Sequence, residues 1–277
     1  MKTNFRTARA EEIAAILDWA AEEGWNPGLD DAPAFHAADP EGFFLAEVGG
    51  QPVASISVVN HSKTFAFLGL YLCRPDFRGQ GIGLALWKHA LDHAGTRTVG
   101  LDGVAAQQAN YARSGFIRAG ATRRFEGHLD GAAHGQISPA RPEDLENLAR
   151  LDRTANGVSR PGFTAAWFAP APDRTTLVWR NLTDILGVAT IRRCREGAKI
   201  GPLIGETAED AVTLARACLG AMPAGRVIVD VPSENVALAA RLRNLGFEMT
   251  FETARMFRGP APETDDTLQA IATMELG

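Results

Sequence analysis

The chain has 277 residues with a formal net charge of −5, and 45% of its residues are hydrophobic and 22% charged. These values are typical of a soluble globular protein with one large domain or two ordinary ones, and they exclude extended disorder and low complexity. The acidic balance and the lack of an apolar run of roughly 18 residues exclude bulk attraction to nucleic acid and a membrane-spanning helix. The three cysteines are widely spaced and the start does not resemble a secretory signal, so we expect a cytoplasmic protein without a disulfide framework.

The first half of the chain predicts a helix, a group of strands and then alternating helices and strands. Apolar periodicity predicts a helix over residues 10–22, and prolines make residues 24–40 a loop-rich stretch. Three strands follow, over residues 43–48, 53–59 and 65–72. The remaining predicted elements are a helix over residues 83–93, a strand over 98–101, a helix over 107–114 and a strand from Phe116 onward.

Short motifs recur at a nearly constant distance along the chain. An Arg-Ala-Glu-Glu-Ile group begins at Arg9, and a similar Arg-Pro-Glu-Asp-Leu group begins at Arg141, 132 residues later. A Gly-Phe pair at Gly115 recurs 131 residues later at Gly246, and a Phe-x-Gly triplet recurs after 132 residues. Three landmarks at nearly one spacing indicate a duplicated domain. The alternative is a chance match, because such helix starts and turns are common.

The second half predicts the same order of elements. They are a helix over residues 143–152, strands over 175–180, 185–193 and 199–204, a helix over 208–221, a strand over 226–231, a helix over 234–244 and a last strand to Phe257. A small, polar stretch near residue 130 suits a linker, so we place one domain at residues 1–130 and the other at 131–277. Helices inserted in a mostly antiparallel order indicate a mixed α/β fold class of the α+β type, with sheets flanked by helices. The tail after residue 260 ends in a short apolar helical pattern that we expect to pack back on the protein.

The strongest chemical signal is a glycine loop between a predicted strand and a predicted helix, Arg78-Gly79-Gln80-Gly81-Ile82-Gly83. Glycines let backbone N–H groups approach a ligand, and the helix start adds unpaired N–H groups and the positive end of the helix dipole. Together these features form an anion site suited to a pyrophosphate. The spacing does not fit the dinucleotide fingerprint, and the sequence contains no Gly-Lys-Ser/Thr of a P-loop. An ordinary glycine-rich turn is the alternative.

This loop closely resembles the acetyl-CoA pyrophosphate loop of the GNAT N-acetyltransferase superfamily, and the order of elements over residues 4–127 is similar to that fold. The resemblance implies two tandem GNAT-like domains, of which the first binds acetyl-CoA. It also implies that the backbone of Leu72 and Cys73 pairs with the pantetheine arm like an added strand. Cys73 is then a small wall residue, and a nucleophilic role is the less favoured alternative. The cofactor-binding residues that it implies are Leu72, Cys73, Arg78, Gly79, Gln80, Gly81, Ile82, Gly83 and Asn110.

A second match to the superfamily is Tyr111, four residues before the Gly115-Phe116 pair. The resemblance implies that this tyrosine protonates the departing CoA thiolate, for which a phenol with a pKa near 10 is suited. Packing on a helix face is the alternative. The sequence departs from the family at Val104, where an asparagine is frequent, and Asn110 or the Gln107-Gln108 pair is the candidate substitute.

The general base that deprotonates the amine is harder to assign, because the strand over residues 65–72 has no acid. Asp102, at the end of the next strand, is the nearest acidic candidate, and a water chain is an equal alternative. Glu23, Trp25, Asn26 and Asp30 belong to the loop that would cover the acceptor site. Helix capping and solvated charge are the alternative roles of the acidic residues.

The second half has lost the glycine loop. The equivalent stretch, residues 198–210, contains Pro202, which lacks an N–H, and acidic residues that would repel a pyrophosphate. This half resembles a degenerate GNAT domain, and we expect it to form a wall of the acceptor cleft, because ligand sites favour domain interfaces. Asp230 and Asn235 are candidate acceptor contacts, and helix capping is the alternative for Asn235.

The leading hypothesis is an N-acyltransferase that moves an acetyl group from acetyl-CoA, its cosubstrate, to a primary amine of a small molecule or peptide. The amine would attack the thioester directly in a ternary complex. The alternative is a non-catalytic CoA-binding sensor or regulatory module, because a fold does not decide a function. We expect a small-molecule amine partner, no metal, no nucleic-acid or membrane partner, and a monomer or homodimer. His89 and His93 share a helix face, but the sequence suggests no third metal ligand.

Overall fold

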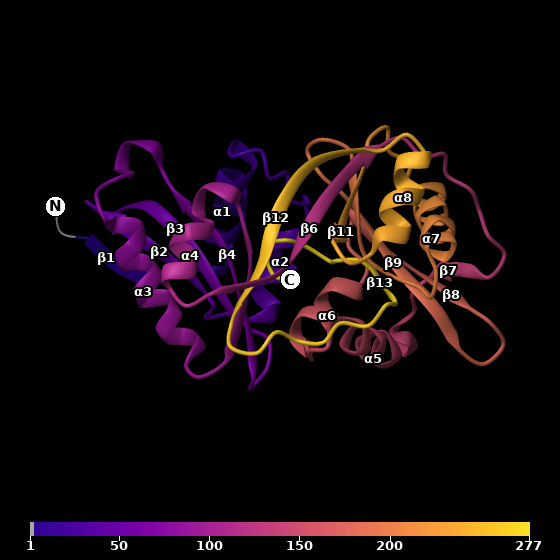
Figure 1. Cartoon of the computed structure of the whole chain (residues 1–277), viewed down its shortest axis with the longest axis horizontal. Coiled ribbons are helices and arrows are strands. Elements are labelled where there is room, and N and C mark those ends of the chain that lie inside the picture. The colour runs from indigo at the N-terminus through magenta and orange to yellow at the C-terminus, as the bar shows by residue number, and fades with distance from the viewer. Residues whose placement is uncertain (1–2) are drawn as a thin grey trace.

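The computed structural model describes residues 3–277, and these form two similarly built halves that share one continuous sheet (Figure 1). The strands of the first half are β1 (Thr3–Thr7), β2 (Phe43–Val48), β3 (Gln51–Asn60), β4 (Phe65–Cys73), β5 (Thr98–Gly103) and β6 (Ile117–Gly127). Its helices are α1 (Ala10–Glu22), α2 (Asp31–Ala38), α3 (Ile82–Ala94) and α4 (Gln108–Arg113).

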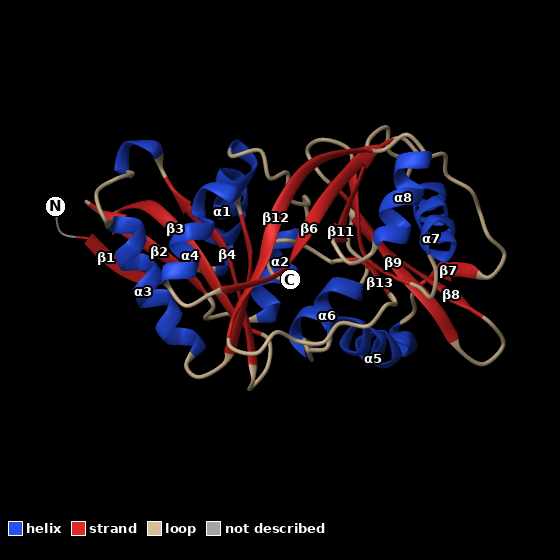
Figure 2. Cartoon of the chain, in the orientation of Figure 1, coloured by secondary structure: helices blue, strands red, loops and turns tan. Residues whose placement is uncertain are grey.

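The second half repeats this order and adds a short final strand. Its strands are β7 (Ile137–Pro139), β8 (Arg174–Arg180), β9 (Ile185–Arg193), β10 (Ala198–Ile204), β11 (Val227–Pro232), β12 (Glu248–Arg258) and β13 (Leu268–Ala270). Its helices are α5 (Leu145–Asn156), α6 (Pro161–Phe168), α7 (Ala208–Ala221) and α8 (Val236–Asn244). The fold is therefore mixed α/β with a mostly antiparallel sheet, as predicted, and helices lie along the sheet in both halves (Figure 2).

The two halves exchange their last long strands. The sheet runs in the order β1-β2-β3-β4-β5-β12-β6-β11-β10-β9-β8-β7, so β12 pairs with β5 of the first half and β6 pairs with β11 of the second. The two exchanged strands pair with each other at the centre of the molecule (Figure 1). In the part of the chain that the structure describes, the parallel pairs are β4–β5 and β10–β11. The exchange brings side chains of β12 next to the first half's β5.

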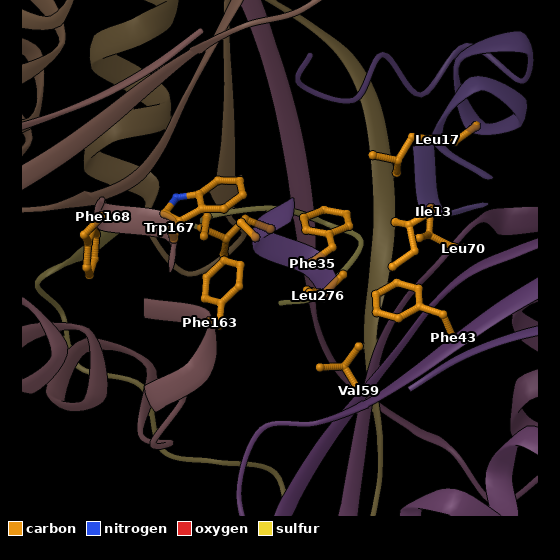
Figure 3. Close-up of a cluster of buried hydrophobic side chains, with 14 of the residues drawn as sticks. Ile13, Leu17, Phe35, Phe43, Val59, Leu70, Phe163, Trp167, Phe168 and Leu276 are labelled. Atoms are coloured by element: carbon orange, nitrogen blue, oxygen red, sulfur yellow. The ribbon is translucent and has the colours of Figure 1, made fainter. Parts of the chain in front are cut away.

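Each half has a core of its own on one face of the sheet, and the two halves share a third core. In the first half α3 packs on β2, β3 and β4, and in the second half α7 and α8 cover the corresponding face. On the opposite face α2 packs directly on α6. This contact joins the helices of the two halves into one shared core, formed by α1, α2, α5 and α6. Figure 3 shows this shared core, in which Phe35 of α2 stacks on Trp167 of α6 with ring centroids 6.3 Å apart. The apolar area buried between the halves holds them as one body.

The predicted elements agree with the structure wherever a clear apolar period runs through them, as in α1 and α7, whose bounds are those predicted. The loop-rich interpretation of residues 24–40 was wrong, because they contain α2. Pro33 lies in the first turn of that helix, where an N–H has no intrahelical acceptor, so it does not interrupt the helix. The sequence pattern did not indicate α6, which begins at Pro161 and buries side chains on several sides, or the short edge strands β1 and β7.

The C-terminal tail packs back on the protein, but it forms β13 and a series of turns instead of the expected helical segment. Residues 268–277 are almost all buried. They contact both halves: Ile271 N donates to Asp230 O of the second half at 3.0 Å, and His61 of the first half donates to Leu276 O at 2.8 Å. Leu276 belongs to the shared core (Figure 3). We call residues 268–277 the C-terminal segment.

His61 connects β3 to the C-terminal segment through a buried hydrogen bond. Its Nε2 donates to the Leu276 carbonyl oxygen at 2.8 Å, and its Nδ1 is buried without a partner. Burial, with the nearby Arg160 guanidinium, lowers the pKa of His61 to about 3. In the unfolded chain the pKa returns to about 6.5, so the unfolded state binds the extra proton first as the pH falls.

We therefore expect the free energy of unfolding to decrease as the pH falls from 6.5 toward 3, with His61 contributing up to about 1.4 kcal/mol per pH unit. His61→Gln keeps a donor for Leu276 O but does not titrate, so it should remove this contribution. Urea unfolding at pH 7.5, 6 and 5 measures the slopes. Equal slopes for the two proteins below pH 6.5 would contradict the assignment.

Candidate functional site

The first half opens a cleft where β4 and β5 separate. The two parallel strands pair from Phe65 with Thr98 to Leu68 with Leu101, and no pair follows along these strands. Immediately beyond this point Leu70 has a φ of +47°, and the register between β3 and β4 shifts there, as in a β-bulge. Ser55 of β3 fixes this bulge by donating its hydroxyl to Leu70 O at 3.0 Å. The backbone beyond the fork is therefore held in one unusual conformation at the base of the cleft.

A cavity of 820 Å³ fills this cleft and continues to the junction of the two halves. We call the part lined by the glycine loop, β4 beyond the fork and α4 the loop end of the cavity. Its lining includes Tyr71, Leu72, Cys73, Arg78, Gly79, Gly81, Gly83, Asn110 and Tyr111. We call the other part the junction end, which is lined by Trp25, Arg124, Glu126, Thr250, Phe251, Thr253, Met274 and Glu275. The volume is within the range of small-molecule sites.

The glycine loop has the geometry of an anion site. Gly79 and Gly81 have φ values of +74° and +79°, and a Cβ built on either would meet no atom within 4 Å, so the backbone faces open space. Helix α3 begins within this motif, at Ile82, and its first N–H groups have no intrahelical acceptor. Arg78 fixes the loop by donating from Nε to Cys73 O at 2.8 Å. The loop therefore fits a pyrophosphate, which needs close backbone N–H groups and a positive helix end.

Most of the predicted cofactor-binding residues line the loop end of the cavity: Leu72, Cys73, Arg78, Gly79, Gly81, Gly83 and Asn110. Gln80 and Ile82 do not line it. The Gln80 side chain donates to Asp76 O at 2.8 Å, and Ile82 is buried in the core under α3. Neither side chain lines the cavity, so binding by these two residues rests on their backbone N–H groups, as the glycine loop predicts, and it stays a prediction. Asn110 is held by neighbours of its own helix region, since its amide donates to Gln107 at 2.6 Å.

Tyr111 lies in the wall of the loop end, and its ring is fixed by packing. It stacks on Trp87 with centroids 5.2 Å apart, and it lies so close to Gly103 that a Cβ there would be 2.9 Å from the ring. Burial, and to a lesser degree Tyr71, raises the pKa of Tyr111 well above its ordinary value. The phenol therefore remains protonated at neutral pH, as a proton donor must.

The structure argues against Asp102 as the general base. Asp102 lines the cavity, but Arg255 of β12 donates to both of its carboxylate oxygens, at 3.0 and 2.7 Å. The hydroxyls of Thr122 and Thr253 add donors at 2.9 and 3.1 Å. Three of these donors reach Oδ1 and the fourth, from Arg255, reaches Oδ2, so the guanidinium pairs with both carboxylate oxygens. Asp102 instead ties the exchanged strands to β5.

The candidates in the loop after α1 fall in different places. Trp25 lines the junction end of the cavity, and Glu23 lies at the rim, where it forms an ion pair with Arg78. Asn26 does not line the cavity, because its amide forms two hydrogen bonds with the backbone of Glu196. The acceptor contact expected of Asn26 is therefore corrected: it attaches this loop to the second half.

Three further acceptor candidates also lie outside the cavity lining. Asp30 accepts a hydrogen bond from Asp173 N at 2.6 Å, and Asn235 caps α8 by accepting from Leu238 N at 3.1 Å. Asp230 forms a buried ion pair with Arg124, at 2.8 and 2.9 Å. Burial alone would raise the pKa of Asp230, but the Arg124 guanidinium holds it below its ordinary value. Their expected substrate contacts are corrected, although Asp230 orients Arg124, which lines the cavity.

The equivalent cleft of the second half is filled by the chain itself. Strand β10 pairs with β11 only from Ala198 to Ile200, and beyond this fork β13 pairs with Leu203 and Ile204. The N-terminus of α7 is also closed, because Thr207 and Asp210 form a reciprocal capping box there. The sequence predicts that the second half has lost its ligand site. The structure gives a physical basis for this loss, because β13 fills the space beyond the fork and the capping box closes the start of α7.

Sequence reasoning missed several residues that line the cavity: Tyr71, Arg124, Phe251, Met274 and Glu275. Tyr71 is the other tyrosine of the chain, and it packs edge-on against Trp87 with centroids 5.3 Å apart. The signal that could have found it is its place one residue before Leu72. The other four come from β6, β12 and the C-terminal segment, and no local pattern in the sequence indicates that these meet.

Within residues 3–277, no helix is long and apolar enough to cross a membrane, and no cluster of three or more metal-ligating side chains is present. His93 pairs with Asp39 at 2.8 Å, and His89 packs on Phe5 and Phe44. The shared helix face of the two histidines is thus occupied by structural contacts.

Comparison with known proteins places both halves in one family. The acetyltransferase (GNAT) family model matches residues 10–120, and an acetyltransferase (GNAT) domain model matches residues 148–269. A protein named holothin acyltransferase, from Pseudoalteromonas sp. (strain SANK 73390), is 34% identical over 276 residues, which are 98% of this chain and 94% of that protein. The uncharacterized N-acetyltransferase YitH of Bacillus subtilis (strain 168) is 20% identical over 96% of each chain.

Solved structures share the fold over the whole chain. A candidate acetyltransferase from Pyrococcus horikoshii has a TM-score of 0.80 and 18% identity, and the match covers 99% of this chain and 96% of that one. A tandem GNAT protein from the clavulanic acid biosynthesis pathway has a TM-score of 0.65 and 17% identity, with 94% and 99% covered. The match to a protein with two GNAT domains extends across both halves of this chain.

Proposed function

Because this chain belongs to the GNAT acyltransferases and contains two GNAT domains, we propose that it transfers an acetyl group from acetyl-CoA to a primary amine. The observation that supports this most is the continuous cavity from the glycine loop to the junction of the halves. It offers an anion site at one end and space for a second small molecule at the other. Such a cavity lets two substrates meet in one orientation, which by itself accelerates a bimolecular reaction.

The residues of the loop end fit the parts of acetyl-CoA. The N–H groups of residues 79–83 would hold the pyrophosphate at the start of α3. The edge of β4 at Leu72 and Cys73, which β5 leaves unpaired beyond the fork, would bind the amides of the pantetheine arm. When bound, acetyl-CoA supplies an activated acyl group as a thioester. The base of the fork at Leu68 would then mark the place of the acyl group.

The chemistry of Cys73 supports direct transfer in a ternary complex. Burial raises the pKa of its thiol, with the Arg78 charge opposing this, so the thiolate that a covalent intermediate requires is not favoured. The other two cysteines are buried away from the cavity. Tyr111 remains protonated and would deliver a proton to the departing sulfur. Thiol-release rates with both substrates varied should give intersecting double-reciprocal lines, whereas parallel lines would indicate a covalent acyl-enzyme.

The relative named holothin acyltransferase supplies the first acceptor to test. We propose a small-molecule amine that enters the junction end, where Trp25, Phe251 and Met274 provide apolar and aromatic surface. Release of free thiol from acetyl-CoA should be followed with holothin and with a panel of primary amines. Binding of acetyl-CoA without thiol release for any acceptor would favour a CoA-binding sensor.

One acetyl-CoA should bind per chain. The first half has an open slot and a free helix end, whereas β13 fills the equivalent slot of the second half and a capping box closes α7. Calorimetric titration of the full chain measures the stoichiometry directly. Two equivalent sites per chain would contradict the assignment of the second half as degenerate.

A further inference from the structure

The C-terminal segment serves both halves at once. Its first part, β13, occupies the slot of the second half, and its later residues Met274 and Glu275 reach the cavity of the first half. The contact with β4 is close: a Cβ added at Gly69 would lie 2.0 Å from Glu275 O. Gly69 is the first residue of β4 beyond the fork with β5. The backbone of Glu275 therefore lies at the base of the fork, where the acyl group is expected.

Glu275 differs from the other acids of the cavity in its partners. Four acidic residues line the cavity: Glu23, Asp102, Glu126 and Glu275. The first three form ion pairs with Arg78, Arg255 and Arg226, respectively. Among residues 3–277, Glu275 has no such arginine partner, and one oxygen of its carboxylate accepts a hydrogen bond from the Thr273 hydroxyl. It is also only 4% exposed. A base needs a lone pair that no guanidinium occupies, and Glu275 meets this condition.

We propose that Glu275 is the general base that takes a proton from the acceptor ammonium; this inference rests on the proposed function. The ammonium has two protons more than the nitrogen of the amide product. One proton goes to Glu275 and then to solvent. The nitrogen lone pair forms the N–C bond while the C–S bond breaks, and the sulfur takes a proton from Tyr111. The second proton of the nitrogen replaces the one that Tyr111 gave to sulfur, so the overall reaction releases one proton.

Charged side chains from several elements surround the C-terminal segment near Glu275. Arg124 of β6 and Lys199 of β10 face it, and Asp230 of β11 balances Arg124 through their ion pair. Lys199 donates to Trp25 O at 2.9 Å. On the other side, Arg160 and His61 donate to the carbonyl oxygens of Gly277 and Leu276, which fixes the backbone. The segment is therefore held by its backbone, while Thr273 orients the carboxylate.

Glu275→Gln keeps the shape and removes the base. We expect kcat with an alkylamine acceptor to fall by about 10²–10⁴-fold at pH 7, with the Kd of acetyl-CoA within threefold of wild type. The fraction of free amine in solution rises about tenfold per pH unit, so the difference in kcat between Glu275→Gln and wild type should shrink by the same factor. This trend should end where the pH reaches the pKa of the ammonium, about 10.4 for a lysine-like amine. Glu275→Asp, which retains a carboxylate, should recover part of the rate.

Glu126→Gln tests the competing carboxylate of the same cavity. The proposal would be overturned if kcat of Glu126→Gln fell and recovered at high pH while kcat of Glu275→Gln did not. It would also be overturned if the loss of kcat in Glu275→Gln did not depend on pH, or if kcat of Glu275→Gln stayed within threefold of wild type. If Glu275→Gln does not fold, Thr273→Val removes the hydroxyl that donates to the carboxylate and accepts from Glu275 N. It should lower kcat about tenfold without changing KM, and an unchanged kcat would overturn the proposal. If the wild-type protein binds acetyl-CoA but acetylates no amine, the proposed function fails as well; normal wild-type turnover with an unaffected Glu275→Gln rejects only this inference.

Discussion

Gly81→Asp is expected to raise the Kd of acetyl-CoA by about three orders of magnitude and to leave the fold intact. Gly81 has a φ of +79°, a region that aspartate tolerates better than most residues, and its Cβ would point into open space. An acidic group at the start of α3 also agrees with the helix dipole, so folding should persist. The added charge would stand where a pyrophosphate approaches, and two like charges about 4 Å apart repel by about 4 kcal/mol near a protein surface.

Gly81→Asn separates charge from size in this experiment, because it has nearly the same shape without the charge. We expect it to weaken binding by less than about tenfold. Calorimetry gives both constants, and thermal unfolding confirms that both variants are folded. Equal affinities for the aspartate variant and wild type would reject the glycine loop as the pyrophosphate site.

Tyr111→Phe is expected to lower kcat by about 10²–10⁴-fold with little change in the KM of acetyl-CoA. The hydroxyl matters when negative charge develops on the departing sulfur, not when the substrate binds. The ring contacts with Trp87 and Gly103 do not involve the hydroxyl, so the variant should fold normally.

Tyr71→Phe is the matched comparison, since Tyr71 lines the same cavity and touches the same tryptophan. We expect a smaller loss of kcat than in Tyr111→Phe. A larger loss in Tyr71→Phe would transfer the role of proton donor to Tyr71. Unchanged turnover of Tyr111→Phe, with chemistry shown to be rate-limiting, would reduce Tyr111 to a packing residue.

The sequence predicted those features that depend on neighbouring residues. The apolar period fixes α1 and α7, and the turn glycines and prolines place β2 to β4 and the glycine loop before α3. The loop residues and Tyr111 could be found because each is part of a short motif on adjacent elements. The family comparison agrees with the two-domain interpretation that the repeated motifs suggested.

The features that the sequence did not reveal depend on distant pairings. Strands β6 and β12 are equivalent in the repeat, so β5 could pair with either one as far as local pattern is concerned, and only the assembled sheet shows the exchange. This exchange brings Arg255 of β12 to Asp102 of β5, so the carboxylate that the sequence suggested as the base forms an ion pair. Glu275 reaches the cavity because the C-terminal segment returns between the halves, and burial against residues about 200 positions away leaves no local signature.

The mass of the acceptor after reaction tests the proposed acetyl transfer most directly. The 277-residue chain should be incubated with holothin and acetyl-CoA whose acetyl group is isotopically labelled, and the product analysed by mass spectrometry. We expect an acceptor that carries one labelled acetyl group on its nitrogen, formed in proportion to the thiol released and absent with the Gly81→Asp variant. Stoichiometric binding of acetyl-CoA with no labelled product from holothin or from any amine of the panel would contradict it.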